Sequence, residues 1–321
     1  MASAKDLQFG APVPQVFFDG KPDMLLVRDT VRRVEELGFH SVWVQDQVVG
    51  DVPLLESISL LCYAAAASSR VKLGVSVVVF PVRNAVQMAK NISTLDLMSN
   101  GRAILGIGLG PVYMPSYFEP FGMTVGQALR RFNEGLEIMK SLWTQPVTDI
   151  EGEFYTLRGT AMEPKPIQQP HPPVWIGGRH PNALRRAVRH GDGYLGSGPT
   201  TTEDFGQHVE LVRKFLDEEG RDPATFPISK RVYLAVDKDE RRAKARLDKF
   251  FGARYPWIIE TRPNFVADIS VWGSPARCVE ELAKVVSKGA ELIVLNPLWD
   301  FVEQLEALAE EVIPQLRQLR G

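Results

Sequence analysis

Two kinds of segment alternate along this chain, short β-branched apolar runs and longer stretches whose apolar residues have helical spacing. The clearest example is Val71 to Gly110, where an apolar run ending at Val79 is followed by a helical stretch and by a second apolar run that begins at Ala103. This order predicts strand, helix, strand. Neither strand has the polar alternation of a half-exposed sheet, so both are expected to be covered on both faces, as in a parallel sheet.

The same alternation extends over the rest of the chain. Eight strands are predicted, at residues 7–18, 41–45, 71–79, 103–110, 174–176, 192–195, 228–236 and 291–295. Helices are predicted at 22–38, 54–67, 86–97, 126–143, 182–190, 202–219, 240–251, 275–288 and 301–319, and a hairpin at 147–157. This order indicates an α/β protein with an eightfold (β/α) TIM-type barrel. We expect a single domain over 1–321, with insertions after strands 4 and 7 at about 111–164 and 237–270.

Composition narrows the class of protein. Apolar residues make up 45% and charged residues 24%, which is ordinary for a soluble globular protein. The formal net charge of -2 gives no indication of nucleic-acid binding. Cys62 and Cys278 are far apart and lack metal-type spacing, as do the five histidines, so we expect no metal site and a reducing, cytoplasmic location. No secretion signal is expected, and no apolar run reaches the roughly 20 residues of a membrane span.

Barrels of this kind place their ligand sites at the carboxyl ends of the strands. Gly177 and Gly178 end one predicted strand just before a helix, where backbone amides and the helix dipole favour an anion, and Arg179 adds a positive charge. The run Gly196, Ser197, Gly198 ends the next strand and offers more amides and a hydroxyl. We therefore predict phosphate binding at these two strand ends. The alternative is that each is only a helix-entry turn.

Three blocks of sequence resemble the bacterial luciferase-like oxidoreductase family. The first is Val71 to Gly110, with Thr94-Leu95-Asp96, Asn100-Gly101-Arg102 and a glycine-spaced strand end. The second is EPKPIQQPHPPVWIGG, residues 163–178, and the third is the tail at 273–297. Together they cover nearly the whole chain.

The resemblance implies an oxidoreductase that uses a flavin-type cofactor, with the F420-dependent branch favoured. The reaction would be hydride transfer between coenzyme F420, a deazaflavin, and a small organic substrate. Two alternatives stay open, an FMN-dependent luciferase-like monooxygenase and a non-catalytic flavin-binding protein. In related F420 enzymes a cis peptide bulges under the ring at the third strand, and the position of Ser76-Val77 resembles that bulge, with a plain buried strand as the alternative. Gly108 and Gly110, at the end of the fourth strand, are also predicted to bind the cofactor.

The chain departs from the family at the end of the second strand. Many members have Asp-His where this chain has Asp46-Gln47, and glutamine cannot shuttle a proton near neutral pH. Both residues are candidates for the catalytic site. Asp46 is also a candidate cofactor ligand, with strand-end capping or ion pairing as its alternative role. In the sugar-phosphate dehydrogenase branch an acidic residue follows the glycines of strand four, where this chain has Pro111, so sugar-phosphate oxidation is not expected.

Aromatic residues suggest the partner. A small apolar or aromatic substrate is expected, on the basis of six residues that could equally be core or dimer contacts: Tyr113, Met114, Tyr117, Phe118, Tyr255 and Trp257. The resemblance also implies a homodimer.

Overall fold

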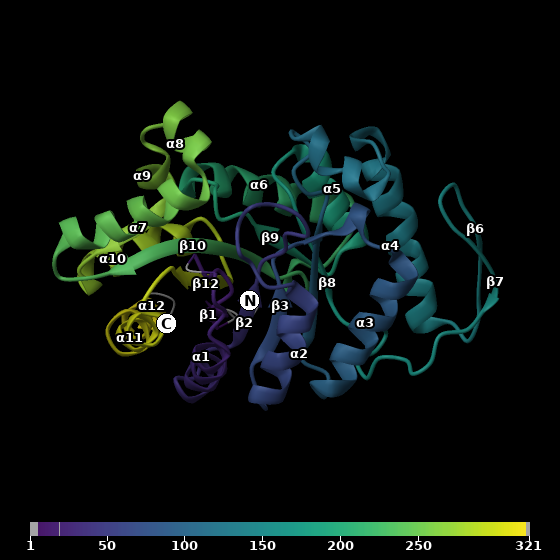
Figure 1. Ribbon diagram of the computed structural model, residues 1–321, viewed down its shortest axis with the longest axis horizontal. Helices are drawn as coiled ribbons and strands as arrows, with labels where there is room; N and C mark the ends of the chain where they lie inside the picture. Colours follow the sequence, from purple (N-terminus) through teal and green to yellow (C-terminus); the bar gives the residue numbers. More distant parts are fainter. Residues whose placement is uncertain (1–5, 19, 319–321) are drawn as a thin grey trace. The chain divides into compact units, whose positions relative to one another are not determined.

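The computed structural model describes residues 6–18 and 20–318 (Figure 1). The eight predicted strands are β1 (Gln8–Pro12), β2 (Ser41–Val44), β3 (Lys72–Val75), β5 (Ala103–Gly108), β8 (Val174–Gly177), β9 (Gly193–Gly196), β10 (Ile228–Val236) and β12 (Leu292–Pro297). The helices of the repeat are α1 (Met24–Glu36), α2 (Ser57–Ala67), α3 (Ala85–Met98), α4 (Ala128–Thr144), α5 (Pro181–His190), α6 (Thr202–Glu218) and α10 (Pro275–Ser287). This order confirms the eightfold (β/α) TIM-type barrel with insertions after strands four and seven.

The described residues divide into two compact units. Unit 1 consists of residues 6–14, 23–43 and 176–318, and unit 2 of residues 15–18, 20–22 and 44–175. The single domain over 1–321 stays a prediction.

Unit 1 is built on parallel strands. β12 pairs with β1 in the register Gln8↔Leu292, and β10 pairs with both β12 and β9. A short strand that the sequence did not predict, β11 (Ser270–Gly273), pairs in parallel with β10. The insertion after β10 contains α7 (Glu240–Arg254), α8 (Pro256–Thr261) and α9 (Phe265–Ile269). Apolar side chains of this insertion pack on Tyr233 of β10, and Figure 1 shows its helices gathered beside that strand.

The chain ends in a helix that changes its hydrogen-bond spacing midway. It comprises α11 (Phe301–Ala307), a π-helical turn (Leu308–Val312) and α12 (Ile313–Gln318). The predicted end of this helix at Leu319 lies outside the described residues. The prediction that the amino terminus carries no secretion signal also falls partly outside them, since residues 1–5 are not described. Within the described ranges, no helix is both long enough and apolar enough to cross a membrane.

Unit 2 contains the segment with the clearest apolar pattern. Its predicted strand at 71–79 is interrupted at the Ser76-Val77 peptide, which is cis, and continues as β4 (Val78–Val79). β3 and β4 both pair in parallel with β5. The predicted hairpin is formed by β6 (Thr148–Glu151) and β7 (Thr156–Thr160), which pair antiparallel and project beyond α4 in Figure 1.

Two of the family-type residues in unit 2 turn out to be structural. The guanidinium of Arg102 is buried and donates to the carbonyls of Ala65, Ser68, Val71 and Ser99, at 2.6 to 3.1 Å. It therefore joins the end of α2, the start of β3 and the end of α3. The buried carboxylate of Asp96 accepts from the backbone amide and side-chain amide of Gln168, at 2.9 and 2.7 Å. These contacts give Asp96 and Arg102 of the family-type segment a structural role that needs no ligand.

Candidate functional site

Three consecutive strand ends of unit 2 lie side by side. The Ser76 amide donates to the Val44 carbonyl at 2.9 Å, which brings the cis peptide to the end of β2. On the other side Val79 is paired with Gly108 at the end of β5. The structure therefore brings Asp46, Ser76-Val77, Gly108 and Gly110 together, as a shared strand-end site requires. That they contact a cofactor stays a prediction.

Gly110 has a local structural reason as well. Its φ is +79°, a left-handed conformation that favours glycine. A Cβ atom there would lie 2.4 Å from Cγ1 of Val79. The backbone after β5 therefore passes tightly over the strand that follows the cis peptide.

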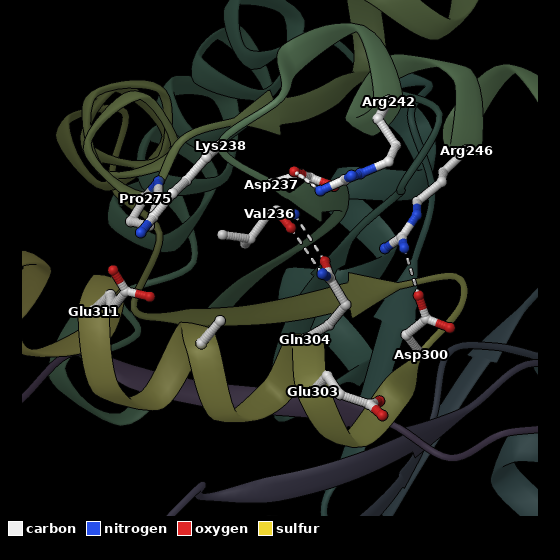
Figure 2. Close-up of a pocket in the computed structure, with 11 residues that line it drawn as sticks. Val236, Asp237, Lys238, Arg242, Arg246, Pro275, Asp300, Glu303, Gln304 and Glu311 are labelled. Carbon is white, nitrogen blue, oxygen red and sulfur yellow. Dashed lines mark hydrogen bonds and ion pairs between the residues drawn. The ribbon is translucent and has the colours of Figure 1, made fainter.

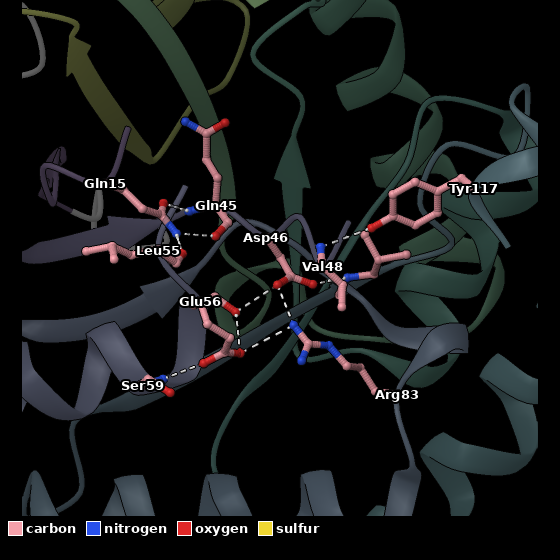
Figure 3. Close-up of polar contacts among 11 residues, drawn as sticks. Gln15, Gln45, Asp46, Val48, Leu55, Glu56, Ser59, Arg83 and Tyr117 are labelled. Atoms are coloured by element: carbon pink, nitrogen blue, oxygen red, sulfur yellow. Dashed lines mark hydrogen bonds and ion pairs between the residues drawn. The ribbon is translucent and has the colours of Figure 1, made fainter. Parts of the chain in front are cut away.

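Asp46 is the centre of a polar cluster in unit 2 (Figure 3). Its side chain is 1% exposed. One carboxylate oxygen accepts from the Ser57 hydroxyl at 2.9 Å and from the Arg83 guanidinium at 2.6 Å. The other accepts from the Val79 amide at 2.9 Å. Asp46 thus has the strand-end ion pair that was its alternative role, and three of the roughly four acceptor positions of its carboxylate are occupied by protein.

The contact observed for the Gln47 side chain does not indicate that it takes the role of the histidine found in many family members. Its side-chain amide lies against Gly50, where a Cβ atom would be only 1.8 Å from Nε2. The side chain therefore packs against the backbone of its own loop. Its candidacy as a catalytic group stays a prediction without a supporting contact.

Tyr117 brings a different proton donor to the same strand end. Its hydroxyl oxygen accepts from the Val48 amide at 3.2 Å (Figure 3). Its ring packs edge-on against Phe118. Among the described residues no acceptor takes its own hydroxyl proton. Burial raises the pKa of this phenol, so it keeps that proton near neutral pH. Sequence reasoning placed Tyr117 only as a pocket wall.

The other predicted pocket walls fall into different classes. Phe118 is fully buried and belongs to a small core within the loop after β5, together with Met123 and Ala128. Tyr113 and Met114 are exposed. In unit 1 Trp257 is exposed, and Tyr255 is half-buried and stacks on Phe251.

The predicted phosphate site lies wholly within unit 1. The hydroxyl of Tyr194, on β9, donates to the Gly178 carbonyl at 3.0 Å and so ties the loop after β8 to the next strand. Added Cβ atoms would lie 2.5 Å from Ala183 at Gly178, 2.6 Å from the Ser229 carbonyl at Gly196 and 2.6 Å from Tyr233 at Gly198. All three glycines are therefore needed for the backbone to take these paths. The structure brings Gly177, Gly178 and Arg179 together with Gly196, Ser197 and Gly198.

Lys230 is a site residue that the predictions missed. Its ammonium is buried within unit 1 and donates to the carbonyls of Ser197, Gly198 and Thr200, at 2.5, 3.2 and 2.8 Å. The signal was present in the sequence, since a lysine stands inside the predicted barrel strand at 228–236. Nearby, the buried hydroxyl of Thr200 has no hydrogen-bond partner.

These groups fit the phosphate of a flavin-type cofactor. In the described part of the chain the amides of Arg179, Gly198 and Thr201 have no protein acceptor, and the Arg179 guanidinium has no ion-pair partner. With the Thr200 hydroxyl they form a set of free donors around a glycine-rich backbone. Donors of this kind bind phosphate oxygens. When bound, such a cofactor would supply the redox chemistry.

The buried ammonium of Lys230 predicts a pH effect on stability. Burial lowers the pKa of Lys230 to about 7, whereas the unfolded chain has the ordinary lysine value. Between pH 7 and about 10 the unfolded state therefore binds more protons at this position, and stability should rise with pH. Denaturant unfolding of the wild type and of Lys230→Met across this range should show the wild type gaining stability relative to the variant. A constant difference across the range would contradict it.

Other charged residues near the predicted phosphate site have structural partners. Arg185 and Arg189 of α5 pair with Glu218 and Glu219, each at 2.7 Å. His180 is the N-cap of α5, and its ring accepts from the Asn182 amide at 3.2 Å. Over residues 6–18 and 20–318 no group of three or more metal-binding side chains occurs.

A pocket of about 540 Å³ lies in unit 1 at the end of β10 (Figure 2). None of the predicted site residues lines it. Its arginines are already paired, Arg242 with Asp237 at 2.6 Å and Arg246 with Asp300 at 2.7 Å. The side chain of Gln304 bonds both backbone groups of Val236, at 2.7 and 2.8 Å. Paired charges of this kind make the pocket a weak candidate for the cofactor.

Comparisons with known proteins agree with this description. The model of the luciferase-like monooxygenase family matches residues 19–292. An F420-dependent glucose-6-phosphate dehydrogenase of Kineococcus radiotolerans is 30% identical over 67% of this chain and 65% of its own length. A phthiodiolone/phenolphthiodiolone dimycocerosates ketoreductase of Mycobacterium sp. is 31% identical over 61% of this chain and 52% of its own. The chain thus spans less than two thirds of either relative.

Solved structures show the same fold at low identity. An F420-dependent secondary alcohol dehydrogenase superposes with a TM-score of 0.82 at 17% identity, over 97% of this chain and 99% of that one. The monooxygenase RslO1 of Streptomyces bottropensis superposes with a TM-score of 0.83 at 20% identity, over 96% and 99%. Because the family model matches most of the chain, this protein belongs to the luciferase-like oxidoreductase family, which has both F420-dependent and FMN-dependent members.

Proposed function

We propose that this protein is an F420-dependent oxidoreductase that transfers hydride between the deazaflavin and a small organic substrate. The observation that carries the proposal is the set of amides at Arg179, Gly198 and Thr201, which have no protein acceptor among the described residues and suit the phosphate of such a cofactor. The 30% identity to an F420-dependent dehydrogenase favours F420 over FMN. The cofactor would carry the redox step, while the chain positions it and excludes water.

Ser76-Val77, Gly108 and Gly110 of unit 2 are proposed as further cofactor-binding residues. Within this unit the Asp46–Arg83 pair holds the backbone at Val79, beside Gly108, in place. The Tyr117 hydroxyl, whose proton has no acceptor among the described residues, would donate a hydrogen bond to a substrate oxygen. It would thereby take over a task for which related proteins have the histidine that Gln47 replaces.

The substrate proposed is small and apolar or aromatic. The exposed side chains of Tyr113 and Met114 support it, because they follow β5 at the same strand-end surface. A sugar phosphate is not proposed, since Pro111 stands where the sugar-phosphate branch has an acidic residue. A cytoplasmic homodimer is part of the proposal.

An FMN-dependent monooxygenase is the second candidate. The matching family model is described as a luciferase-like monooxygenase, and the monooxygenase RslO1 shares the fold. The phosphate site would suit FMN as well.

The test is to titrate the purified protein with F420 and separately with FMN and to follow tryptophan fluorescence. Trp43 and Trp175 lie on barrel strands β2 and β8 and serve as reporters. Tight F420 binding with weak FMN binding is expected. The reverse would replace the proposal with the monooxygenase, and binding of neither would overturn both.

A further inference from the structure

The loop between β9 and α6, residues 197–201, has its carbonyl groups turned toward one side chain. Lys230 donates to three of them, those of Ser197, Gly198 and Thr200. In the described residues no carboxylate forms an ion pair with this ammonium. The charge is instead compensated by carbonyl dipoles of the loop, so the loop's conformation and the lysine depend on each other.

Peptide geometry fixes the direction of the loop amides once the carbonyls are held. In a trans peptide the C=O bond and the following N–H bond point in opposite directions. With the carbonyl of Ser197 held by Lys230, the amide of Gly198 points away from the lysine. The same holds for Thr200 and the amide of Thr201. Together with the amide of Arg179, these two amides are the phosphate-loop amides that have no protein acceptor among the described residues.

The loop after β8 is arranged by the same principle. The Tyr194 hydroxyl holds the Gly178 carbonyl at 3.0 Å, so the amide of Arg179 is turned away from it. Burial raises the pKa of Tyr194, and the phenol therefore stays a donor. Each of the two predicted phosphate loops thus has a buried donor behind it.

The acidic side chains near the loop at 197–201 do not explain how its carbonyls are held. Glu203, in the first turn of α6, pairs with Lys288 at 2.7 Å. The amide of Asp204 is capped by the Thr201 hydroxyl at 3.0 Å, and its carboxylate acts on Lys230 only through space. A carboxylate has no hydrogen to donate to a carbonyl. The Ser197 carbonyl also accepts from the Thr200 amide, at 3.3 Å, but Lys230 is the one side chain shown to donate to the carbonyls of Ser197, Gly198 and Thr200 in the described part of the chain.

We propose that Lys230 is a positioning residue for the anion site: its ammonium holds the carbonyls of the loop at 197–200 inward, so that the amides of Gly198 and Thr201 face a phosphate. This inference rests on the proposed function for the identity of the ligand. Lys230 itself does not touch the ligand. Its effect should therefore be confined to the phosphate, whereas a residue that only supports the fold would weaken binding of every part of a cofactor.

The experiment compares two probes that differ only in the phosphate, FMN and riboflavin, in the full-length protein. The dissociation constants are measured at pH 6, where the pKa of about 7 leaves Lys230 largely charged. For the wild type we expect FMN to bind at least tenfold more tightly than riboflavin. In Lys230→Met this ratio should fall toward one while riboflavin affinity is unchanged. Lys230→Gln, which keeps two N–H donors, should restore part of the ratio.

Matched controls separate the possible failures. Lys238→Met removes a lysine two residues beyond the end of the same strand and should leave the ratio as in the wild type. If the wild-type ratio is itself near one, the phosphate site of the proposed function is wrong. A large wild-type ratio that survives in Lys230→Met would overturn the role of Lys230 alone. Equal weakening of both probes in Lys230→Met and Lys230→Gln would show a merely structural lysine.

Amide hydrogen exchange gives a second readout that needs no cofactor. In the wild type the loop at 197–201 should be ordered, and inorganic sulfate should slow exchange at Gly198 and Thr201. In Lys230→Met the protection by sulfate should be lost while the rest of β10 exchanges as before. Unchanged protection by sulfate in the variant would contradict the proposal.

Discussion

Replacement of Arg102 by methionine should lower the free energy of unfolding by about 3 to 5 kcal/mol. The substitution preserves much of the volume but leaves four buried carbonyls, those of Ala65, Ser68, Val71 and Ser99, without their donor. Each unsatisfied buried carbonyl costs on the order of 1 to 3 kcal/mol, partly relieved by relaxation or entering water. Urea unfolding followed by circular dichroism measures the change.

Two variants calibrate this result. Arg102→Lys keeps three donors at one point instead of a planar fork and should lie between the wild type and the methionine variant. Arg32→Met removes an exposed arginine of α1 and should change stability by no more than about 0.5 kcal/mol. A loss below about 1 kcal/mol in Arg102→Met would mean that the four carbonyls are satisfied in another way.

The second large effect is expected at Asp46. Asp46→Ala leaves the Val79 amide without its acceptor and the Arg83 guanidinium without its nearest carboxylate, in a place where the lost side chain was 1% exposed. Loss of one partner of a buried ion pair costs about 3 to 5 kcal/mol, and Arg83, being 19% exposed and still near Glu56, should bring this to about 2 to 4 kcal/mol. Because Val79 lies beside Gly108, a proposed cofactor-binding residue, cofactor affinity should also fall at least tenfold.

Glu56→Gln is the matched control for this prediction. Glu56 contacts the same arginine at 3.3 Å, but its side chain is 41% exposed. A partly exposed pair contributes about 0 to 1 kcal/mol, so the glutamine variant should be close to the wild type in stability and in cofactor affinity. Equal losses of stability in the two variants would show that the burial of Asp46 does not make its ion pair more stabilising than that of Glu56. Both properties are measured by thermal unfolding with and without cofactor.

The outline of the fold follows from local pattern. The strand at 228–236 is predicted to the residue, because it lies between a proline turn at Pro227 and a charged segment that begins at Asp237. β11 was missed because its four residues follow a helix and have no distinctive alternation of their own. Its place beside β10 depends on tertiary pairing, which a local pattern does not contain.

Some features of the candidate site can likewise be predicted from the sequence, and others depend on tertiary contacts. Glycines at strand ends pointed to Gly178 and Gly198, because the need for close backbone approach is visible in the residue type itself. The partners of Asp46, at Ser57, Val79 and Arg83, could not be read from the sequence, since they come from three separate segments. Lys230 could have been found, because a lysine inside a barrel strand requires acceptors for its ammonium wherever that group is buried.

The pairing of β1 with β12 bears on how the chain folds. β1 pairs early in the chain with β2 on one edge, but on its other edge Gln8 finds its partner only when Leu292 is available, so this edge waits for nearly the whole polypeptide. Residues 44–175 of unit 2, in contrast, form one continuous stretch of the chain. Pairings between distant residues form slowly because a long loop must be closed first. During synthesis unit 2 should therefore become protease-resistant first, while the exposed edge of β1 is a natural place for a chaperone to bind.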